Sequence, residues 1–238
     1  MSPTSHLLAH EALAAVLQVR EERLQVLLWQ RAREPFLGAW ALPGGYLGTV
    51  ETLEQSIRRH LAAKVDVREL AHLEQLETRS DPRRHPAERL VATAYLGLVP
   101  AHLDPTIPED TTWHPVDDLP ETAFDHGAIA LAARERLRAK LSYTNLGFAL
   151  APPSFTISEL RELYRAALGY EVSATNLQRV LLRRELLEPV GETRPPGRVG
   201  GRPAAVYRFR HRGLEVTDPF AVLRPPGSVA GGGSAGNR

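Results

Sequence analysis

The chain has 238 residues and contains no cysteine, and its lysines occur only at positions 64 and 140. Without cysteine there is no disulfide bond and no thiolate metal site. The sequence has no run of about 18 apolar residues, so a membrane-spanning helix is not expected. Its first residues also lack the basic leader and apolar stretch of a secretory signal. Together these absences favour a cytoplasmic protein without a membrane partner.

Acidic and basic residues divide unevenly along the chain. The net charge is only +1, but residues 151–238 hold 13 arginines and 8 acidic residues, whereas residues 1–150 hold 16 basic and 20 acidic ones. Chance scatter is one explanation. The other is a chain of two domains, the second of which faces a polyanion.

Strand and helix patterns alternate in the first part of the chain. Expected strands cover residues 12–20, 24–30, 67–77 and 89–99, and expected helices cover 51–64 and 126–141. Thr49 can cap the first of these helices. The mixture predicts an α/β domain over residues 1–142, followed by a linker at 143–154.

Two helices with recognisable ends follow the linker. Thr156 and Glu159 have the spacing of a capping box at the start of a helix over 157–167, and Gly169 can end that helix. Ser173 can cap a second helix that begins with the sequence ATNLQRV.

Two further strands are expected around 188–192 and 204–210, with a tip between them that is rich in glycine, proline and arginine. Helix, turn, helix and hairpin is the order of a winged helix-turn-helix, which we assign to residues 155–223. Residues 224–238 are rich in proline, glycine and serine and are expected to be disordered.

The stretch LPGGYLGTVETLEQSIRRHLAAKVDV at residues 42–67 resembles a Nudix box, a pattern that ends in REUXEEXGU, where U is a bulky aliphatic residue. Gly45, Glu51 and Arg59 have the spacing of its first three landmarks, and Leu61 and Val67 keep two aliphatic positions. The resemblance implies a Nudix-like mixed-sheet sandwich domain.

The same stretch departs from the pattern where a metal would bind. His60, Ala63 and Lys64 stand in place of acids, and Asp66 stands in place of the last glycine. Positions 60, 63 and 64 lie on one face of the expected helix. In Nudix hydrolases, carboxylates there gather Mg²⁺, a cation that needs oxygen ligands. Without a metal there is no activated water, so we expect no metal site, no catalytic residues and no enzyme of the family type.

A glycine-rich loop leading into a helix N-terminus remains, and such a place suits a phosphate group. Alternatively, Gly44 and Gly45 form a tight turn. For Glu51 and Arg59 we favour an ion pair that braces the loop over a ligand-binding role.

A second resemblance covers about residues 8–212. The segments LEQLETRSDPRRHPAERLVATAYLGLVP, WHPVDDLPETAFDH, FTISELRELYRAALG and GRPAAVYRF are similar, in order, to those of the Nudix-related transcriptional regulators of NAD metabolism. That family implies a repressor of NAD biosynthesis or salvage genes, with no cofactor. It also implies a homodimer on a palindromic double-stranded DNA operator, released by an effector such as ADP-ribose. Paralogues in the family control other sugar-nucleotide pathways.

ADP-ribose carries a diphosphate, two riboses and an adenine, so its pocket needs cations, backbone N–H groups and an apolar or aromatic face. Loop charge, core packing and helix capping are the alternative roles for such residues. The candidate ligand-binding residues are Trp40, Gly45, Tyr46, Arg79, Arg83, Arg89 and His126.

In a helix-turn-helix, the N-terminal residues of the second helix contact base edges in the major groove. Arginines of the wing can reach the DNA backbone or the minor groove, although a solvated basic loop is the alternative. The candidate DNA-binding residues are Ser173, Thr175, Asn176, Gln178, Arg179 and Arg183 in the helix and Arg194, Arg198 and Arg202 in the wing.

The alternative function is a Nudix hydrolase of ADP-ribose-like diphosphates with a relocated metal site. Glu74, Glu77 and Asp81 are the acids considered for such a site. A protein with both functions is a third possibility.

Overall fold

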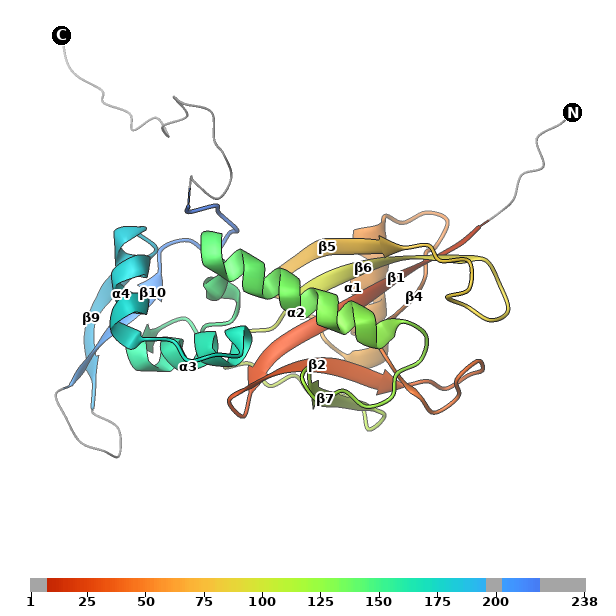
Figure 1. The fold of residues 1–238 in the computed structure, drawn as a ribbon, viewed down its shortest axis with the longest axis horizontal. Helices are drawn as coiled ribbons and strands as arrows, with labels where there is room; N and C mark the ends of the chain where they lie inside the picture. Colours follow the sequence, from red (N-terminus) through yellow and green to blue (C-terminus); the bar gives the residue numbers. More distant parts are fainter. Residues whose placement is uncertain (1–7, 196–202, 219–238) are drawn as a thin grey trace, which may run out of the picture.

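The computed structural model describes residues 8–195 and 203–218. Figure 1 shows a larger part built on a mixed sheet, and beside it a smaller part with two helices and a three-stranded sheet. The expected order of a mixed α/β domain and then a winged helix is confirmed. None of the helices in the described part has the length and apolar character that a membrane crossing requires.

The larger sheet has the order β3-β2-β1-β6-β5, with β4 also paired to β1 and β7 to β2. β1 and β6 run parallel, and every other pairing is antiparallel. The strands are β1 (Ala9–Arg20), β2 (Arg23–Gln30), β3 (Trp40–Ala41), β4 (Gly44–Tyr46), β5 (His72–Arg79), β6 (Leu90–Leu98) and β7 (Thr111–Pro115).

β1 changes partner along its length. Its C-terminal half pairs with β2, from Leu17 to Arg20, whereas Glu11 to Leu13 pair with β4. The sheet therefore splits beside the N-terminal half of β1. The glycine pair that we expected in a loop or tight turn lies in β4, where a Cβ on Gly44 would collide with the backbone of β1.

One helix covers each face of the sheet, α1 (Leu53–Val65) and α2 (His126–Tyr143). Successive side chains of a strand point to opposite faces. Leu13 and Leu17 of β1 accordingly pack in the same core cluster as α2, whereas Ala14 and Val16 pack in the cluster of α1. The resulting layers give the sandwich expected from the sequence.

The ends of α1 differ from the expectation. Thr52, not Thr49, caps the helix: its hydroxyl accepts a hydrogen bond from the Gln55 amide, and the Gln55 side chain accepts one from the Thr52 amide. Thr49 lies three positions before Thr52, so a cap at Thr49 would require almost one more helical turn. At the other end Asp66 has φ 51°, a left-handed conformation that glycine adopts most easily and aspartate at modest cost.

The smaller part contains β8 (Phe155–Thr156), α3 (Ile157–Leu168), α4 (Ala174–Arg183), β9 (Leu187–Arg194) and β10 (Ala204–Phe209), with the sheet order β8-β10-β9. The capping box of Thr156 and Glu159 is confirmed, and Gly169 ends α3 with φ 78°. Ser173 caps α4 as expected, because its hydroxyl accepts a hydrogen bond from the Asn176 amide.

The connector between the two parts is packed inside the protein. It contains a 3₁₀ helix, η1 (Leu146–Ala149), and Leu146, Phe148 and Leu150 are buried in the same core cluster as α2 and α3. A Cβ on Gly147 would lie well inside contact distance of the Tyr164 hydroxyl. Because α3 also contacts β1, β2 and α2, one continuous core joins the two parts.

Candidate functional site

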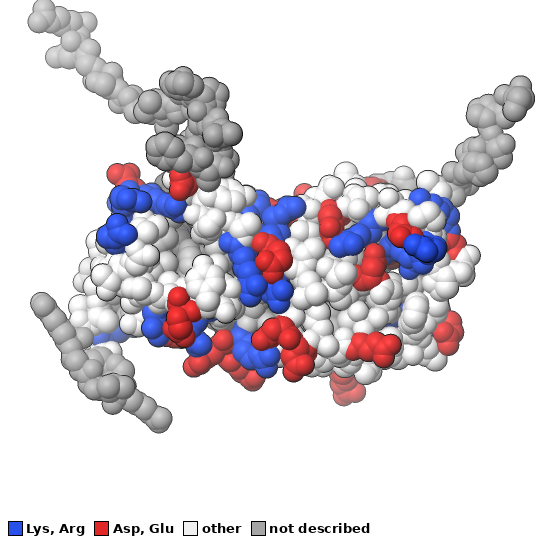
Figure 2. Space-filling model, in the orientation of Figure 1, with Lys and Arg blue, Asp and Glu red and all other residues white. Residues whose placement is uncertain are grey.

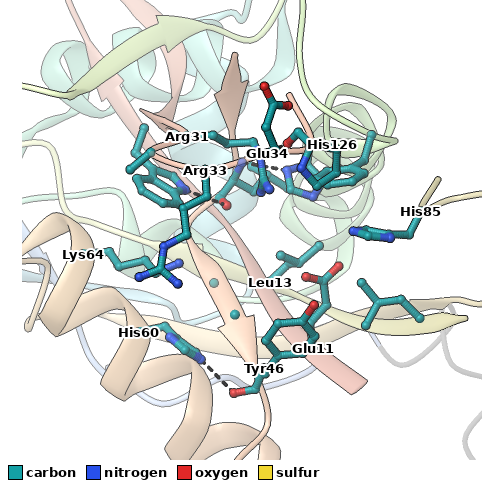
Figure 3. A pocket seen from close by; sticks show the side chains of 18 of the residues that line it. Glu11, Leu13, Arg31, Arg33, Glu34, Tyr46, His60, Lys64, His85 and His126 are labelled. Carbon is teal, nitrogen blue, oxygen red and sulfur yellow. Dashed lines mark hydrogen bonds between the residues drawn. The ribbon is translucent and has the colours of Figure 1, made fainter. Parts of the chain in front are cut away.

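A cavity of about 760 Å³ opens where the sheet splits, and we call it the β1–α1 cavity. Its walls come from the N-terminal half of β1, the end of β2 with the loop after it, β4, one face of α1, the 85–90 segment and the start of α2. Figure 3 shows Lys64 and Arg33 toward one side of this cavity and His85 toward the other.

The face of α1 on which a Nudix hydrolase carries its acids forms part of the wall. His60 and Lys64 line the cavity, and His60 Nε2 lies 3.1 Å from the Tyr46 carbonyl oxygen. Burial lowers the pKa of His60, so its imidazole is the neutral form at neutral pH. A Cβ on Gly45 would lie 2.5 Å from the His60 ring, which is why a glycine stands opposite this histidine.

Lys64 lies on the same helical face one turn further along. Its Nζ is 4.3 Å from the centre of the Trp29 ring, a cation–π geometry. Trp29 is itself held by a hydrogen bond from its indole Nε1 to the Leu42 carbonyl oxygen, at 3.2 Å. Burial, and after it the nearby Arg31, lower the pKa of Lys64.

Glu51 and Arg59 form the expected brace. Arg59 Nε donates to a Glu51 carboxylate oxygen at 2.9 Å, and the Gly48 amide donates to the other oxygen at 2.6 Å. The bond from Arg59, followed by that from Gly48, lowers the pKa of Glu51 to about 2. Glu51 does not line the β1–α1 cavity.

Aromatic rings form the opposite side of the cavity. Phe124 stacks on His85 with 5.3 Å between ring centres, and the Arg31 guanidinium carbon lies 4.7 Å from the Phe124 ring centre. Arg31 is held in place because its Nε donates to the Pro35 carbonyl oxygen at 2.8 Å. A flat ring entering here can stack on an aromatic surface beside a guanidinium.

His126 begins α2 and is buried. Its Nδ1 accepts a hydrogen bond from the Leu42 amide at 3.0 Å, so the ring proton belongs on Nε2, which has no hydrogen-bond partner within the described residues. Burial lowers the pKa of His126 to about 3. The residue is therefore a neutral N–H donor at the cavity wall.

A buried arginine that sequence reasoning missed supports this wall. The side chain of Arg84 is 2% exposed and donates to Glu11 at 2.7 Å and to Asp125 at 2.9 Å. Glu11 lines the cavity and Asp125 precedes α2. Arg84 thus fixes the position of β1 relative to the start of α2.

Of the expected ligand residues, Gly45, Tyr46 and His126 line the cavity, and Tyr46 donates its hydroxyl hydrogen bond to Glu88. This bond raises the pKa of Tyr46 to about 12.

The other four expected ligand residues do not line the cavity. Trp40 packs its ring against His114, 4.5 Å between centres. Arg79 pairs with Glu77, Arg83 with Asp81, and Arg89 donates to the Ser80 carbonyl oxygen. The cations at the cavity are Arg31, Arg33 and Lys64 instead. Helical spacing predicted that His60 and Lys64 share one face of α1, but no sequence pattern assigned Lys64 or the two arginines to the ligand.

The N-terminus of α1, which we expected to hold a phosphate, does not line the cavity. The helix begins at Leu53, the Thr52 hydroxyl accepts the hydrogen bond of the Gln55 amide, and the cavity lies beside His60 and Lys64 further along.

The donor set at this site does not fit the Mg²⁺ that a Nudix fold implies. Lys64 places an ammonium, which has no lone pair, where a carboxylate would be needed. Residues 8–195 and 203–218 hold no cluster of three His, Asp or Glu side chains with metal-binding geometry.

The acids considered for a relocated metal site are occupied elsewhere. Glu74 lies 2.5 Å from Lys140 Nζ and 3.0 Å from His72 Nε2. Although its burial opposes ionisation, these two partners lower its pKa to about 2. Glu77 pairs with Arg79, and Asp81 accepts a hydrogen bond from the Arg83 amide.

The second candidate site is the outer face of α4. Leu177 and Leu181 face the core, whereas Thr175, Asn176, Arg179 and Arg183 are exposed. Arg179 donates to the Asn176 side-chain oxygen at 2.7 Å. Ser173 and Gln178 have structural partners, because Ser173 caps the helix and Gln178 donates to the Tyr207 hydroxyl.

Arg194 of β9 does not project freely from the wing. Both Glu159 oxygens accept hydrogen bonds from it, at 2.8 and 2.6 Å, and so does Ser154. Arg198 and Arg202 lie outside the described residues, as does the segment 224–238. On the face shown in Figure 2, basic and acidic side chains are interspersed over the junction between the two parts.

Comparisons with known proteins agree with the two-domain organisation. The NUDIX domain model matches residues 9–133, and the model of the NrtR DNA-binding winged helix domain matches residues 147–209. The chain is 32% identical over 204 residues to the ADPR responsive transcriptional repressor NtrR of Acinetobacter baylyi, which covers 82% of this chain and 79% of that protein.

The crystal structure of Shewanella oneidensis NrtR complexed with a 27mer DNA is 32% identical, covers 84% of this chain and 93% of that one, and superposes with a TM-score of 0.72. The chain is also 29% identical over 126 residues to an ADP-ribose pyrophosphatase of Methanocaldococcus jannaschii. This match covers 50% of this chain and 71% of that protein. The family expected from the sequence segments is confirmed, and the chain belongs to the NrtR family of transcriptional repressors, which join a Nudix domain to a DNA-binding winged helix.

Proposed function

We propose that this repressor controls genes of NAD biosynthesis or salvage, and that ADP-ribose or a related NAD-derived nucleotide releases it from DNA. The nucleotide occupies the β1–α1 cavity, in a Nudix domain over residues 1–142 that senses it without hydrolysing it. The winged helix, residues 155–223, binds a palindromic operator as part of a homodimer.

The observation that carries the proposal is that the cavity combines cations with an aromatic surface. Lys64 and Arg33 lie toward one side, Phe124 with His85 form the other, and the Arg31 guanidinium lies over the Phe124 ring. A nucleotide diphosphate has both matching groups, because its phosphates suit cations and its base suits an aromatic surface. The relative from A. baylyi is itself described as ADPR responsive.

The exposed residues of α4, namely Thr175, Asn176, Arg179 and Arg183, are proposed to contact DNA. Asparagine suits adenine and arginine suits guanine in the major groove. Arg198 and Arg202 remain proposed contacts of the wing tip.

Coupling requires the nucleotide to favour a dimer geometry that separates the two recognition helices wrongly for the operator. β1 is suited to carry that change, since Glu11 and Leu13 line the cavity while Glu22, just after β1, bonds to Arg165 of α3. The packed connector, residues 143–154, is the second route. Equal inter-domain angles in DNA-bound and nucleotide-bound crystals would refute this mechanism.

The test is fluorescence anisotropy of a labelled promoter fragment from NAD-biosynthesis genes, with ADP-ribose titrated in and AMP assayed in the same samples. Specific binding that ADP-ribose abolishes without AMP formation supports the proposal. Absence of specific binding, together with accumulation of AMP, contradicts it.

A hydrolase of ADP-ribose is the second candidate, favoured by the similarity to the M. jannaschii pyrophosphatase. It would need a metal, and the acids considered for a relocated metal site, Glu74, Glu77 and Asp81, pair with Lys140, Arg79 and Arg83. We therefore expect no AMP in Mg²⁺ or Mn²⁺.

A further inference from the structure

Three cations at the β1–α1 cavity lack a carboxylate partner, whereas most other cations among the described residues form an ion pair. Within residues 8–195 and 203–218, Arg31, Arg33 and Lys64 form no ion pair with a carboxylate. By contrast, Arg58 and Arg59, on the same helix as Lys64, pair with Glu54 and Glu51.

The acids that line the cavity form no ion pair with these cations. Glu11 pairs with Arg84, and Glu88 accepts the Tyr46 hydroxyl. Glu34 is the remaining lining acid, and it is exposed and forms no ion pair with a described residue. None of the three lining acids is therefore paired with Arg31, Arg33 or Lys64, and these cations are available to an anionic ligand.

Of the three, Lys64 is the one carried by α1. It is half-buried, its ammonium lies over the Trp29 ring, and it has no hydrogen-bond acceptor among the described residues. A partly buried ammonium without an acceptor is costly, and an anion that enters the cavity removes this cost. The position is also the one at which a Nudix hydrolase holds Mg²⁺ through a carboxylate.

We propose that Lys64, together with Arg31 and Arg33, binds the phosphate groups of the nucleotide directly, so that fixed side-chain cations replace the divalent metal ion of a Nudix enzyme. This inference rests on the proposed function for the identity of the nucleotide. The chemistry required is that of two linked phosphate groups. Binding then needs no metal, and the diphosphate is held without an activated water beside it.

The experiment is isothermal titration of the full chain with ADP-ribose and, separately, with inorganic pyrophosphate, each in EDTA and in MgCl₂. The unmodified protein should bind ADP-ribose equally well, within about two-fold, in both buffers. Lys64→Gln should weaken binding of both probes about ten-fold or more, because a hydrogen bond to a charged group is lost. Lys64→Glu should weaken it further in EDTA, and MgCl₂ should restore part of the loss.

Arg58→Gln is the matched control. It removes one positive charge from the same helix, but Arg58 does not line the cavity and pairs with Glu54, so ADP-ribose affinity should stay within about two-fold. Thermal unfolding of each variant separates misfolding from loss of the site, and Lys64→Arg should retain most of the affinity.

Two results overturn the inference while the proposed function stands: ADP-ribose binding that requires Mg²⁺ in the unmodified protein, or Lys64→Gln that binds as well as the unmodified chain. Lys64-dependent binding of pyrophosphate without binding of ADP-ribose supports the inference and refutes the proposed effector. Binding of neither probe refutes both.

Discussion

Glu22, in the turn between β1 and β2, accepts a hydrogen bond from Arg165 of α3 at 2.9 Å, across the junction of the two domains. The Glu22 side chain is 77% exposed, and exposed ion pairs contribute about 0–1 kcal/mol. Leu160 of α3 is fully buried in the shared core. Apolar packing should therefore dominate the junction.

We expect Glu22→Gln to lower the free energy of unfolding by less than about 1 kcal/mol. Leu160→Ala should lower it by about 2–5 kcal/mol. Urea unfolding of both variants at pH 7 checks the comparison. Equal losses would mean that the ion pair holds the domains together.

His126 should make the protein less stable in mild acid. Its folded pKa is about 3, below the value of about 6.5 in an unfolded chain. As pH falls below about 6.5, the unfolded chain binds a proton that the folded chain does not. The free energy of unfolding then falls by up to about 1.4 kcal/mol per pH unit for this group.

His126→Asn should reduce that dependence, since an amide oxygen can accept the bond from the Leu42 amide but does not titrate. Urea unfolding between pH 7 and pH 5 measures the slope, above the range in which Glu51 and Glu74 take up protons. Buried His60 and His114 contribute with the same sign, so a residual slope is expected. An unchanged slope would contradict the assignment.

Arg84→Met should be strongly destabilising, because it leaves Glu11 and Asp125 without their shared cation. Loss of one partner of a buried ion pair costs about 3–5 kcal/mol. Adding Glu11→Gln and Asp125→Asn to this variant should recover part of the loss in urea unfolding. Arg23→Met, which breaks a pair with the 66% exposed Asp117, is the control and should cost about 1 kcal/mol or less.

Arg179 and Arg183 should affect DNA binding differently. Arg179→Ala is expected to cost about 1–3 kcal/mol on the operator and to relax specificity at one position. Arg183→Ala should weaken binding to all sequences and reduce the slope of log K against log salt by about 1. Anisotropy on operator and scrambled DNA over a salt series distinguishes the two.

Arg194→Ala is the comparison for that experiment. Because Arg194 holds Glu159 and Ser154, its loss should lower the unfolding temperature of the protein. A normal unfolding temperature with loss of operator binding alone would instead make Arg194 a DNA contact.

The order of elements could be predicted because local signals agree with the fold. The capping box at Thr156, the cap at Ser173 and the left-handed Gly169 are readable from residue type and spacing. The predicted cap of α1 was wrong because threonine is a good cap at either position 49 or 52. Which of the two begins the helix depends on the path of the loop after β4.

Three of the expected ligand residues, Gly45, Tyr46 and His126, line the cavity. Helical spacing predicted that His60 and Lys64 share a face of α1, but the sequence analysis did not assign them to the ligand. Arg31 and Arg33 come to the same cavity through a loop after β2, and Arg79, Arg83 and Arg89 turn to partners nearby. Neither outcome follows from local pattern, because loop geometry depends on tertiary contacts.

The buried connector has an evolutionary consequence. Leu146, Phe148 and Leu150 pack on both domains, and Gly147 leaves room for Tyr164. An ordinary surface linker tolerates insertions and deletions between relatives. Here a single added residue would rotate these side chains out of register with their neighbours. The number of residues that connect the sensing domain to the DNA-binding domain should therefore vary little among functional homologues, even where surface loops differ in length.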